Sequence, residues 1–384
     1  MEAPPRTVGD VLAAVAELSP QIAARAAEIE TARRLPADLL GQLVAAGCFR
    51  LVRPPSHGGL GATLTEAMEA LEKLASADGS VGWTVMIGAG SWIDLAGLPA
   101  ATFDELFAGR PDAITAGIFA PSGTIAPVDG GYRVSGRWAF ASGCEHADWL
   151  FGNCLEGFAD GIPQLRIAVF APEQVIIEDT WHVAGLRGTG SHHFHVDDIV
   201  VPAARTHDPL AEETCLDTPI VRIPPPPLIG TVIGAVALGI AQGALDDIVA
   251  IAAGKVPLFD PAALATNPGF QRDLAGADAT LAAAHTLLYD VANRLWDNSV
   301  ARRQPTLELH VRARAAAVWA TERAVDVVTF AYRAGGSTSL YDSCPLQRRL
   351  RDIYAVTQHF VVKRDTLTIA GRALAGQDLG VPIF

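Results

Sequence analysis

The chain carries little charge for its length, and what charge it carries is mostly acidic. Only 18% of its 384 residues are Asp, Glu, Lys or Arg, and the formal net charge is -13. Runs of Lys and Arg interleaved with aromatic residues are lacking. Because an acidic surface repels phosphate groups, nucleic acid and anionic lipid are not expected as partners. Half of the residues are hydrophobic, which predicts large buried faces in the core or between subunits.

Cysteines are few, and phosphate-binding motifs are missing. The five cysteines have no metal-type spacing, and their odd number and spread favour a reducing cytoplasm over a disulfide scaffold. The sequence has no Walker-type loop, no dinucleotide fingerprint and no Gly-x-Ser-x-Gly elbow. The glycines of Gly58–Gly61 do not follow a strand or open a helix, as a phosphate loop requires. No nicotinamide-binding fold is therefore expected.

One run, from Leu228 to Leu245, has no charged residue at all. It is marginal in length for the ~20 apolar residues of a membrane span. It is rich in Gly and Ala, and Asp246 and Asp247 follow at once. We expect a buried central helix here and no membrane association. The segment MEAPPRTVGD has neither the charged start nor the apolar stretch of a signal peptide, and a cytoplasmic location is expected.

Three blocks of different texture follow one another along the chain. Helical spacing of apolar residues marks 1–115 and 225–384, whereas short β-type runs broken by Gly, Pro and Asp fill 116–210. The four prolines that end at Pro227 close the connection before the last block, because they cannot occupy a helix interior. Helices, then strands, then helices predict an α+β protein with a β-domain between two helical domains.

Local signals set some boundaries inside these blocks. Pro36 opens a helix that Gly47 ends, and Gly130-Gly131 marks a tight turn between strands. Further helices are expected over 65–77, 270–296, 310–333 and 345–375.

Two glycine-containing segments of the middle block are candidate binding segments. GRWAFASG (136–143) combines aromatic residues with a small hydroxyl residue and a glycine. WHVAGLRGTGS (181–191) offers backbone N–H groups that could bind an anion or the edge of a heterocycle. Taken alone, each is equally explained by an ordinary strand that ends in a turn.

Histidines suggest metal binding or catalysis only weakly. His193 and His195 would share one face of a strand. Two imidazoles without a third ligand and an orienting shell are not a metal site, so no metal is predicted. His359 lies on a predicted helix, and composition does not separate it from a structural histidine.

Three segments in order resemble the acyl-CoA dehydrogenase superfamily, and the match covers most of the chain. LPADLLGQLVAAGCFRLVRPPSHGGLGATL (35–64) resembles its first helices and the turn that follows. FASGCEHADW (140–149) resembles its aromatic-Ile-Thr-Asn-Gly segment, with Ser142 at the Thr position. AGGSTSLYDSCPLQRRLRD (334–352) resembles its Gly-Gly…Arg-Asp signature. The resemblance implies an N-terminal helical domain (1–115), a central β-barrel-like domain (116–210) and a C-terminal four-helix bundle (225–384), assembled as a homotetramer.

A departure from the family pattern predicts the chemistry. Counted from Arg351-Asp352, the catalytic Glu of most dehydrogenases falls at Phe360, which cannot take a proton, so fatty acyl-CoA dehydrogenation is not expected. The neighbouring residue is His359, and a histidine at this place resembles the flavin-dependent monooxygenase branch. The complete Trp-x-x-x-Gly-Leu-Arg-Gly-Thr-Gly-Ser stretch from Trp181 to Ser191 is also typical of that branch.

The resemblance implies the oxygenase component of a two-component monooxygenase. A separate NAD(P)H-dependent reductase would supply reduced flavin, FAD or FMN, and O2 would form a flavin hydroperoxide in a dry cavity. The substrate would be an aromatic small molecule, phenol- or indole-like. His359 would be the acid/base group, because its unperturbed pKa near 6.5 suits both roles.

The same resemblance assigns contacts to the flavin and the substrate. Ser142 would donate a hydrogen bond near flavin N5, and Phe140 and Trp181 would flank the ring. Gly335, Gly336 and Ser337 would approach the flavin tail from a neighbouring subunit, with Lys255 as a phosphate anchor. The remaining cofactor contacts would come from Ala141, Arg187, Thr189, Gly190 and Ser191. His57, Trp83 and Trp92 would line the substrate site, unless both tryptophans belong to the core.

Three alternatives stay open. One is an oxidase or dehydrogenase that acts on a non-CoA substrate with His359 as the base. Another is oxygenation at nitrogen or sulfur instead of carbon. The third is a structural homologue that binds no flavin.

Overall fold

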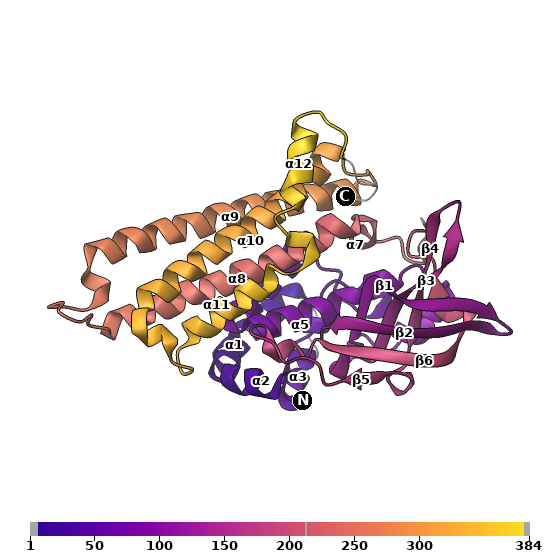
Figure 1. Ribbon diagram of the computed structural model, residues 1–384, viewed down its shortest axis with the longest axis horizontal. Coiled ribbons are helices and arrows are strands. Elements are labelled where there is room, and N and C mark those ends of the chain that lie inside the picture. The colour runs from indigo at the N-terminus through magenta and orange to yellow at the C-terminus, as the bar shows by residue number, and fades with distance from the viewer. Residues whose placement is uncertain (1–6, 212, 380–384) are drawn as a thin grey trace.

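The computed structural model describes residues 7–211 and 213–379. It shows two helical parts with a β-sheet between them in sequence, an acyl-CoA dehydrogenase-like architecture that confirms the predicted fold class (Figure 1). The helices of the first part are α1 (Val8–Ala24), α2 (Ala26–Ala32), α3 (Ala37–Ala45), α4 (Leu64–Ala77), α5 (Gly79–Gly90) and α6 (Ala100–Phe107). The helices of the last part are α7 (Pro219–Arg222), α8 (Pro225–Gly254), α9 (Pro268–Val300), α10 (Leu307–Gly335), α11 (Pro345–Val356) and α12 (Thr366–Leu374).

The central sheet is mixed and has the strand order β5-β6-β2-β1-β3-β4-β7. β1 and β3 run parallel, and the other neighbours are antiparallel. Gly130, at φ +84°, occupies the expected turn between β1 and β2. The strands are β1 (Thr115–Val128), β2 (Gly131–Ala141), β3 (Trp149–Ala159), β4 (Ile162–Phe170), β5 (Ile176–Glu178), β6 (His192–Pro202) and β7 (Thr206–His207).

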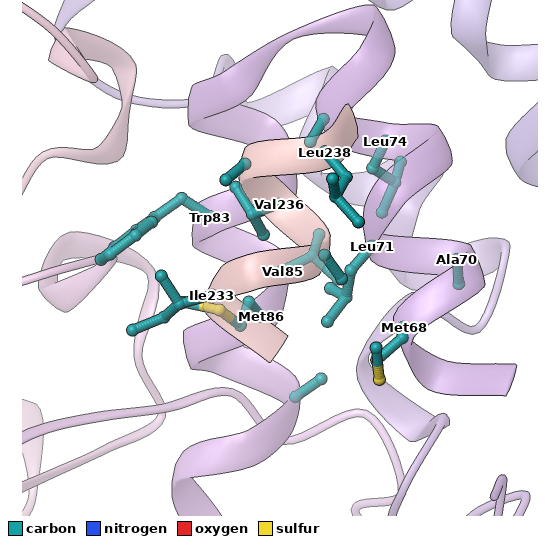
Figure 2. Close-up of a cluster of buried hydrophobic side chains, with 14 of the residues drawn as sticks. Met68, Ala70, Leu71, Leu74, Trp83, Val85, Met86, Ile233, Val236 and Leu238 are labelled. Carbon is teal, nitrogen blue, oxygen red and sulfur yellow. The ribbon is translucent and has the colours of Figure 1, made fainter. Parts of the chain in front are cut away.

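Helix α8 lies at the centre of the helical part, as its lack of charge predicts. It is the one helix within the described residues that is long and apolar enough to cross a membrane, and 83% of its most apolar window is buried inside the protein. Gly239 lets it approach α4 closely, because a Cβ there would stand 2.2 Å from the Glu72 carbonyl oxygen. Figure 2 shows side chains of α4, α5 and α8 packed together, including Leu71, Val85 and Leu238.

Two expectations about helix limits are wrong. The chain from 345 to 375 is not one helix, because α11 ends at Val356, the 3₁₀ turn η10 (Phe360–Val362) follows, and α12 begins at Thr366. The prolines before Leu228 do not all lie outside the helix. Pro225–Pro227 form the first turn of α8, where proline is tolerated because the first N–H groups have no partner within the helix.

Candidate active site

Three segments distant in sequence meet beside α5. They are the end of β2 at Phe140–Ser142, the loop 181–191, and the stretch that follows α11. Asp78 fixes the start of α5, since its carboxylate accepts the backbone N–H groups of Ser80 (2.9 Å) and Val81 (3.1 Å). Further along α5, Trp83 lies at the edge of the apolar cluster and points away from Leu71 (Figure 2).

A line of buried hydroxyl groups joins Trp83 to the loop 181–191. The Trp83 indole N–H donates to Ser142 Oγ (3.0 Å), and Ser142 Oγ lies 2.7 Å from Ser191 Oγ. Ser191 Oγ lies 2.6 Å from Thr189 Oγ1. The structure thus brings together four residues predicted from the sequence to belong to the site, Trp83, Ser142, Ser191 and Thr189. It directs the hydroxyls of Thr189 and Ser191 toward each other and toward Ser142.

His359 stands next to this line. Its ring lies 5.9 Å from the Trp83 ring in an edge-on arrangement. The sequence predicted that His359 lies in a helix, and this is wrong. The residue is the N-cap of η10, where its Nδ1 accepts the Val361 N–H (3.4 Å). This bond leaves the proton of the neutral ring on Nε2.

The expected unperturbed pKa of His359 is also wrong. Packing around the ring lowers the pKa of the imidazole to about 4, because burial disfavours its charged form. At neutral pH the side chain is therefore an uncharged imidazole. It can take a proton or donate a hydrogen bond from Nε2, but it does not act as a standing imidazolium.

Aromatic rings form a wall beside the hydroxyl line. Phe140 is 66% exposed although apolar, and its backbone adopts φ +69°, which is uncommon for a residue with a side chain. The Trp181 ring lies 6.2 Å from it and the His193 ring 5.9 Å. An exposed ring held in an uncommon backbone conformation suits the stacking of a planar heterocycle. Ala141 is fully buried, so its side chain lies away from this surface.

Arg187 lies in the same loop 181–191 and contributes a polar group. Its Nε is buried and has no hydrogen-bond partner among the described residues. A buried donor without a partner costs free energy, so an acceptor is expected opposite it. The exposed rings, the hydroxyl line and this free donor together fit a bound flavin.

Two residues that the sequence analysis did not place in the site hold the loop 181–191 from α11. Asp352 accepts the Leu186 N–H through Oδ1 (2.6 Å), and Arg351 donates to the Ala184 carbonyl oxygen (2.6 Å). Gly185 lies so close that a Cβ there would stand 2.0 Å from the Arg351 carbonyl oxygen. Burial, with Asp78 nearby, raises the pKa of Asp352 to about 7. The Arg-Asp pair was visible as a family signature, but sequence gave no partner for it.

His193 and His195 are used within the protein. His195 Nδ1 lies 2.9 Å from Glu178 Oε1, and the His193 ring packs against Phe140. Over residues 7–211 and 213–379, no group of three or more His, Cys, Asp or Glu side chains is arranged to hold a metal ion.

A second set of expected cofactor residues lies elsewhere in the chain. Lys255 Nζ donates to the Gly335 carbonyl oxygen (2.8 Å) and to Thr338 Oγ1 (2.7 Å), next to Gly336 and Ser337. Figure 1 shows that the C-terminal ends of α8 and α10 lie at the end of the helical bundle that is remote from the sheet. One chain therefore does not bring this set to the hydroxyl line.

The expected substrate residues are also divided. Trp83 contacts Ser142 and His359, whereas Trp92 is fully buried against Phe103, 6.1 Å between ring centroids. His57 packs on the same Phe103 ring (5.1 Å) and lies 2.9 Å from Asp104. Trp92 belongs to the core of the first helical part, which was the alternative left open for it. Of the three residues, only Trp83 directly contacts the hydroxyl line or His359.

Comparisons with known proteins show the family to which the chain belongs. Family models match at residues 12–100 (acyl-CoA dehydrogenase, N-terminal domain) and 231–364 (acyl-CoA dehydrogenase, C-terminal domain). Indole-3-acetate monooxygenase of Pseudomonas putida is 32% identical over 92% of this chain and 90% of its own. The oxygenase component of FADH2-dependent resorcinol hydroxylase of a Rhizobium species is 35% identical over 97% and 94%. The structure of XiaF from a Streptomyces species, in complex with FADH2 and glycerol, superposes with a TM-score of 0.92 at 26% identity, covering 98% of each chain.

Proposed function

Since the chain belongs to the acyl-CoA dehydrogenase family and, within it, to the flavin-dependent monooxygenases, we propose that it is an oxygenase component that hydroxylates a phenol- or indole-like small molecule. The observation that carries the proposal is the contact of Trp83 with both Ser142 and His359. It places a neutral imidazole beside a hydroxyl line and an exposed aromatic wall, where a dehydrogenase would need a carboxylate.

The residues around this place would hold the flavin in stated ways. Phe140 and Trp181 would flank the ring, and the buried Arg187 Nε would donate to an acceptor of the cofactor. Gly190 adopts φ +52°, a conformation that lets the loop turn at this point. When bound, reduced flavin supplies the electrons that activate O2, and the protein must keep water from this chemistry.

His359 would handle the proton of the substrate. Its Nδ1 accepts the Val361 N–H, so Nε2 carries the hydrogen of the neutral ring and can donate to an oxygen atom. To take the phenolic or indolic proton instead, the neutral ring would use the lone pair of Nδ1, which requires the Val361 N–H to release that atom, and the ring would then be an imidazolium. A pKa near 4 means that this role needs no protonation from solvent at neutral pH.

Replacing His359 tests the proposal. We expect His359→Ala to lower hydroxylation of indole-3-acetate or resorcinol, whichever probe the wild type accepts, by roughly a hundredfold or more. Hydrogen peroxide released per reduced flavin should rise in the same variant. Product and peroxide would be measured after photoreduced flavin and the enzyme are mixed with O2. His285→Ala, a change of a half-buried histidine on α9 that contacts Glu72 and Tyr289, is the matched control.

Two outcomes would overturn the assignment. Unchanged coupling in His359→Ala would remove the histidine from the reaction. A wild-type product that has lost hydrogen but gained no oxygen, with one peroxide per turnover, would instead indicate the oxidase alternative.

Partners and assembly follow from the same proposal. A separate NAD(P)H-dependent reductase would supply reduced FAD or FMN. Lys255, Gly335, Gly336 and Ser337 would contact the flavin tail of a neighbouring subunit, because one chain holds them away from Phe140. We propose a cytoplasmic homotetramer, which light scattering would distinguish from a monomer.

A further inference from the structure

The hydroxyl line runs from Trp83 to Leu186, and the direction of hydrogen bonding is fixed at both of its ends. Four links join five groups: the Trp83 indole N–H, Ser142 Oγ, Ser191 Oγ, Thr189 Oγ1 and the Leu186 carbonyl oxygen, at 3.0, 2.7, 2.6 and 2.8 Å in that order. An indole N–H only donates, and a carbonyl oxygen only accepts. The first link therefore carries the proton of Trp83, and the last carries that of Thr189.

The sense of the two middle links follows from this. Each hydroxyl has one proton. Because Thr189 gives its proton to Leu186, the link between Ser191 and Thr189 takes the proton of Ser191. The link between Ser142 and Ser191 then takes the proton of Ser142. If Ser142 turned its proton elsewhere, two buried oxygen atoms would face each other at 2.7 Å or less without a hydrogen between them, which is unfavourable.

The carbonyl end of the line cannot turn away. The Leu186 N–H is bound by Asp352 Oδ1 (2.6 Å), and the Leu186 carbonyl oxygen also accepts the Trp181 indole N–H (3.0 Å). Leu186 adopts φ +50°, a conformation that side-chain-bearing residues rarely take. Asp352 of α11 therefore holds Leu186 at its N–H, and Trp181 holds it at its carbonyl oxygen.

We propose that Thr189 is a positioning residue that makes Ser142 a hydrogen-bond acceptor toward the flavin. This direction of hydrogen bonding favours binding of the reduced cofactor over the oxidised one. The inference rests on the proposed function, which sets Ser142 beside the ring. Reduction converts ring nitrogens of a flavin from acceptors into N–H donors. Ser142, whose proton is directed to Ser191, keeps a lone pair for such a donor and offers nothing to an acceptor. This reverses the donor role that the sequence predicts for Ser142.

Replacing Thr189 by valine tests the direction of hydrogen bonding along the line, since valine lacks the hydroxyl group but has nearly the same shape. Ser191 can then donate to Ser142, and the proton of Ser142 is released toward the flavin. We expect the ratio of the dissociation constants for oxidised and reduced flavin to fall roughly tenfold. Both constants would be measured by fluorescence titration, anaerobically for the reduced form, with FMN or FAD according to which the wild type binds more tightly.

Three further variants make the test specific. Thr189→Ser retains a hydroxyl and should restore the wild-type ratio, which a purely steric role would not predict. Ser191→Ala breaks the line at another link and should shift the ratio in the same direction, which guards against misfolding of the valine variant. Thr84→Val is the matched control, because the buried Thr84 hydroxyl has no partner among the described residues.

The outcomes separate the two proposals. A wild type that binds flavin, with an unchanged ratio in both Thr189→Val and Ser191→Ala, would overturn the inference and leave the proposed function standing. A wild type that binds neither flavin form would overturn both.

Discussion

Trp83 lies in α5 and Trp92 in the 3₁₀ turn that follows it (η3, Ser91–Leu95), and the two side chains have different roles. Trp83 is 7% exposed, its N–H is bonded to Ser142, and its ring meets His359. Trp92 has no exposed surface, packs on Phe103, and its N–H has no partner in the described part of the chain. The two positions are nine apart, and at about 100° per residue in α5 and somewhat more in the 3₁₀ turn this places the side chains on roughly opposite sides of the helical segment. One side builds the candidate site and the other builds the core.

The difference teaches that residue type alone misassigns an aromatic side chain. Both tryptophans suit a wall for a planar substrate, and both were placed there from the sequence. Their helical phase already indicates that only one of them can face a given cavity. The large residue on the other side fills the interior, where its volume stabilises the fold and its polar atom stays unused.

The largest expected effect on the free energy of unfolding comes from removing Trp92, on the core side. We expect Trp92→Ala to lower the free energy of unfolding by about 3–5 kcal/mol, because it removes a fully buried ring and leaves a cavity beside Phe103. Urea unfolding at pH 7 would measure the loss. A loss under about 1 kcal/mol would contradict the assignment of Trp92 to the core.

A smaller effect on stability is expected on the site side, where the contribution of His359 depends on pH. His359 has a pKa of about 4 in the folded protein and about 6.5 in the unfolded chain. Between these values the unfolded chain binds a proton that the folded protein does not, so stability falls as the pH drops from 6.5 to 4. From pH 7 to pH 5 this group should cost about 2 kcal/mol.

The measurement compares the wild type with His359→Gln by urea unfolding at both pH values. The variant should lose about 2 kcal/mol less than the wild type on acidification. Equal losses would mean that the folded protein protonates this ring as readily as the unfolded chain does.

The smallest effect isolates one hydrogen bond. Trp83→Phe in α5 and Trp92→Phe in the following 3₁₀ turn remove the same atoms from opposite sides of this segment. Only Trp83→Phe removes a hydrogen bond and leaves Ser142 without a donor, so it should be the more destabilising by about 1 kcal/mol once the lost ring volume is matched. If Trp92→Phe proved equally costly, the indole N–H of Trp83 would contribute nothing to stability.

Sequence predicted the fold well wherever the signal was local. The uncharged run of α8, the start of α3 and the turn at Gly130 depend on neighbouring residues, and all three were found as expected. The break after Val356 was missed, because the helical spacing of apolar residues continues through 360–362.

The site was predicted in part, for a physical reason. Ser142, Thr189 and Ser191 came from a family pattern, and the structure confirms that they lie together. Asp352 holds Leu186 across 166 positions of sequence, and nothing in RRLRD states that its partner is a backbone N–H. The lowered pKa of His359 arises from packing around its ring, which no local pattern encodes.

Helix α8 also has a consequence for how the chain is made. It packs between α4, which is synthesised earlier, and α10, whose last residue follows the end of α8 by about eighty positions. At ribosomal speeds that delay is on the order of ten seconds. During this interval the uncharged surface that will face α10 has no cover from its own chain. We therefore expect newly made chains to need a holding chaperone at this stage, and truncation before α10 to yield aggregates.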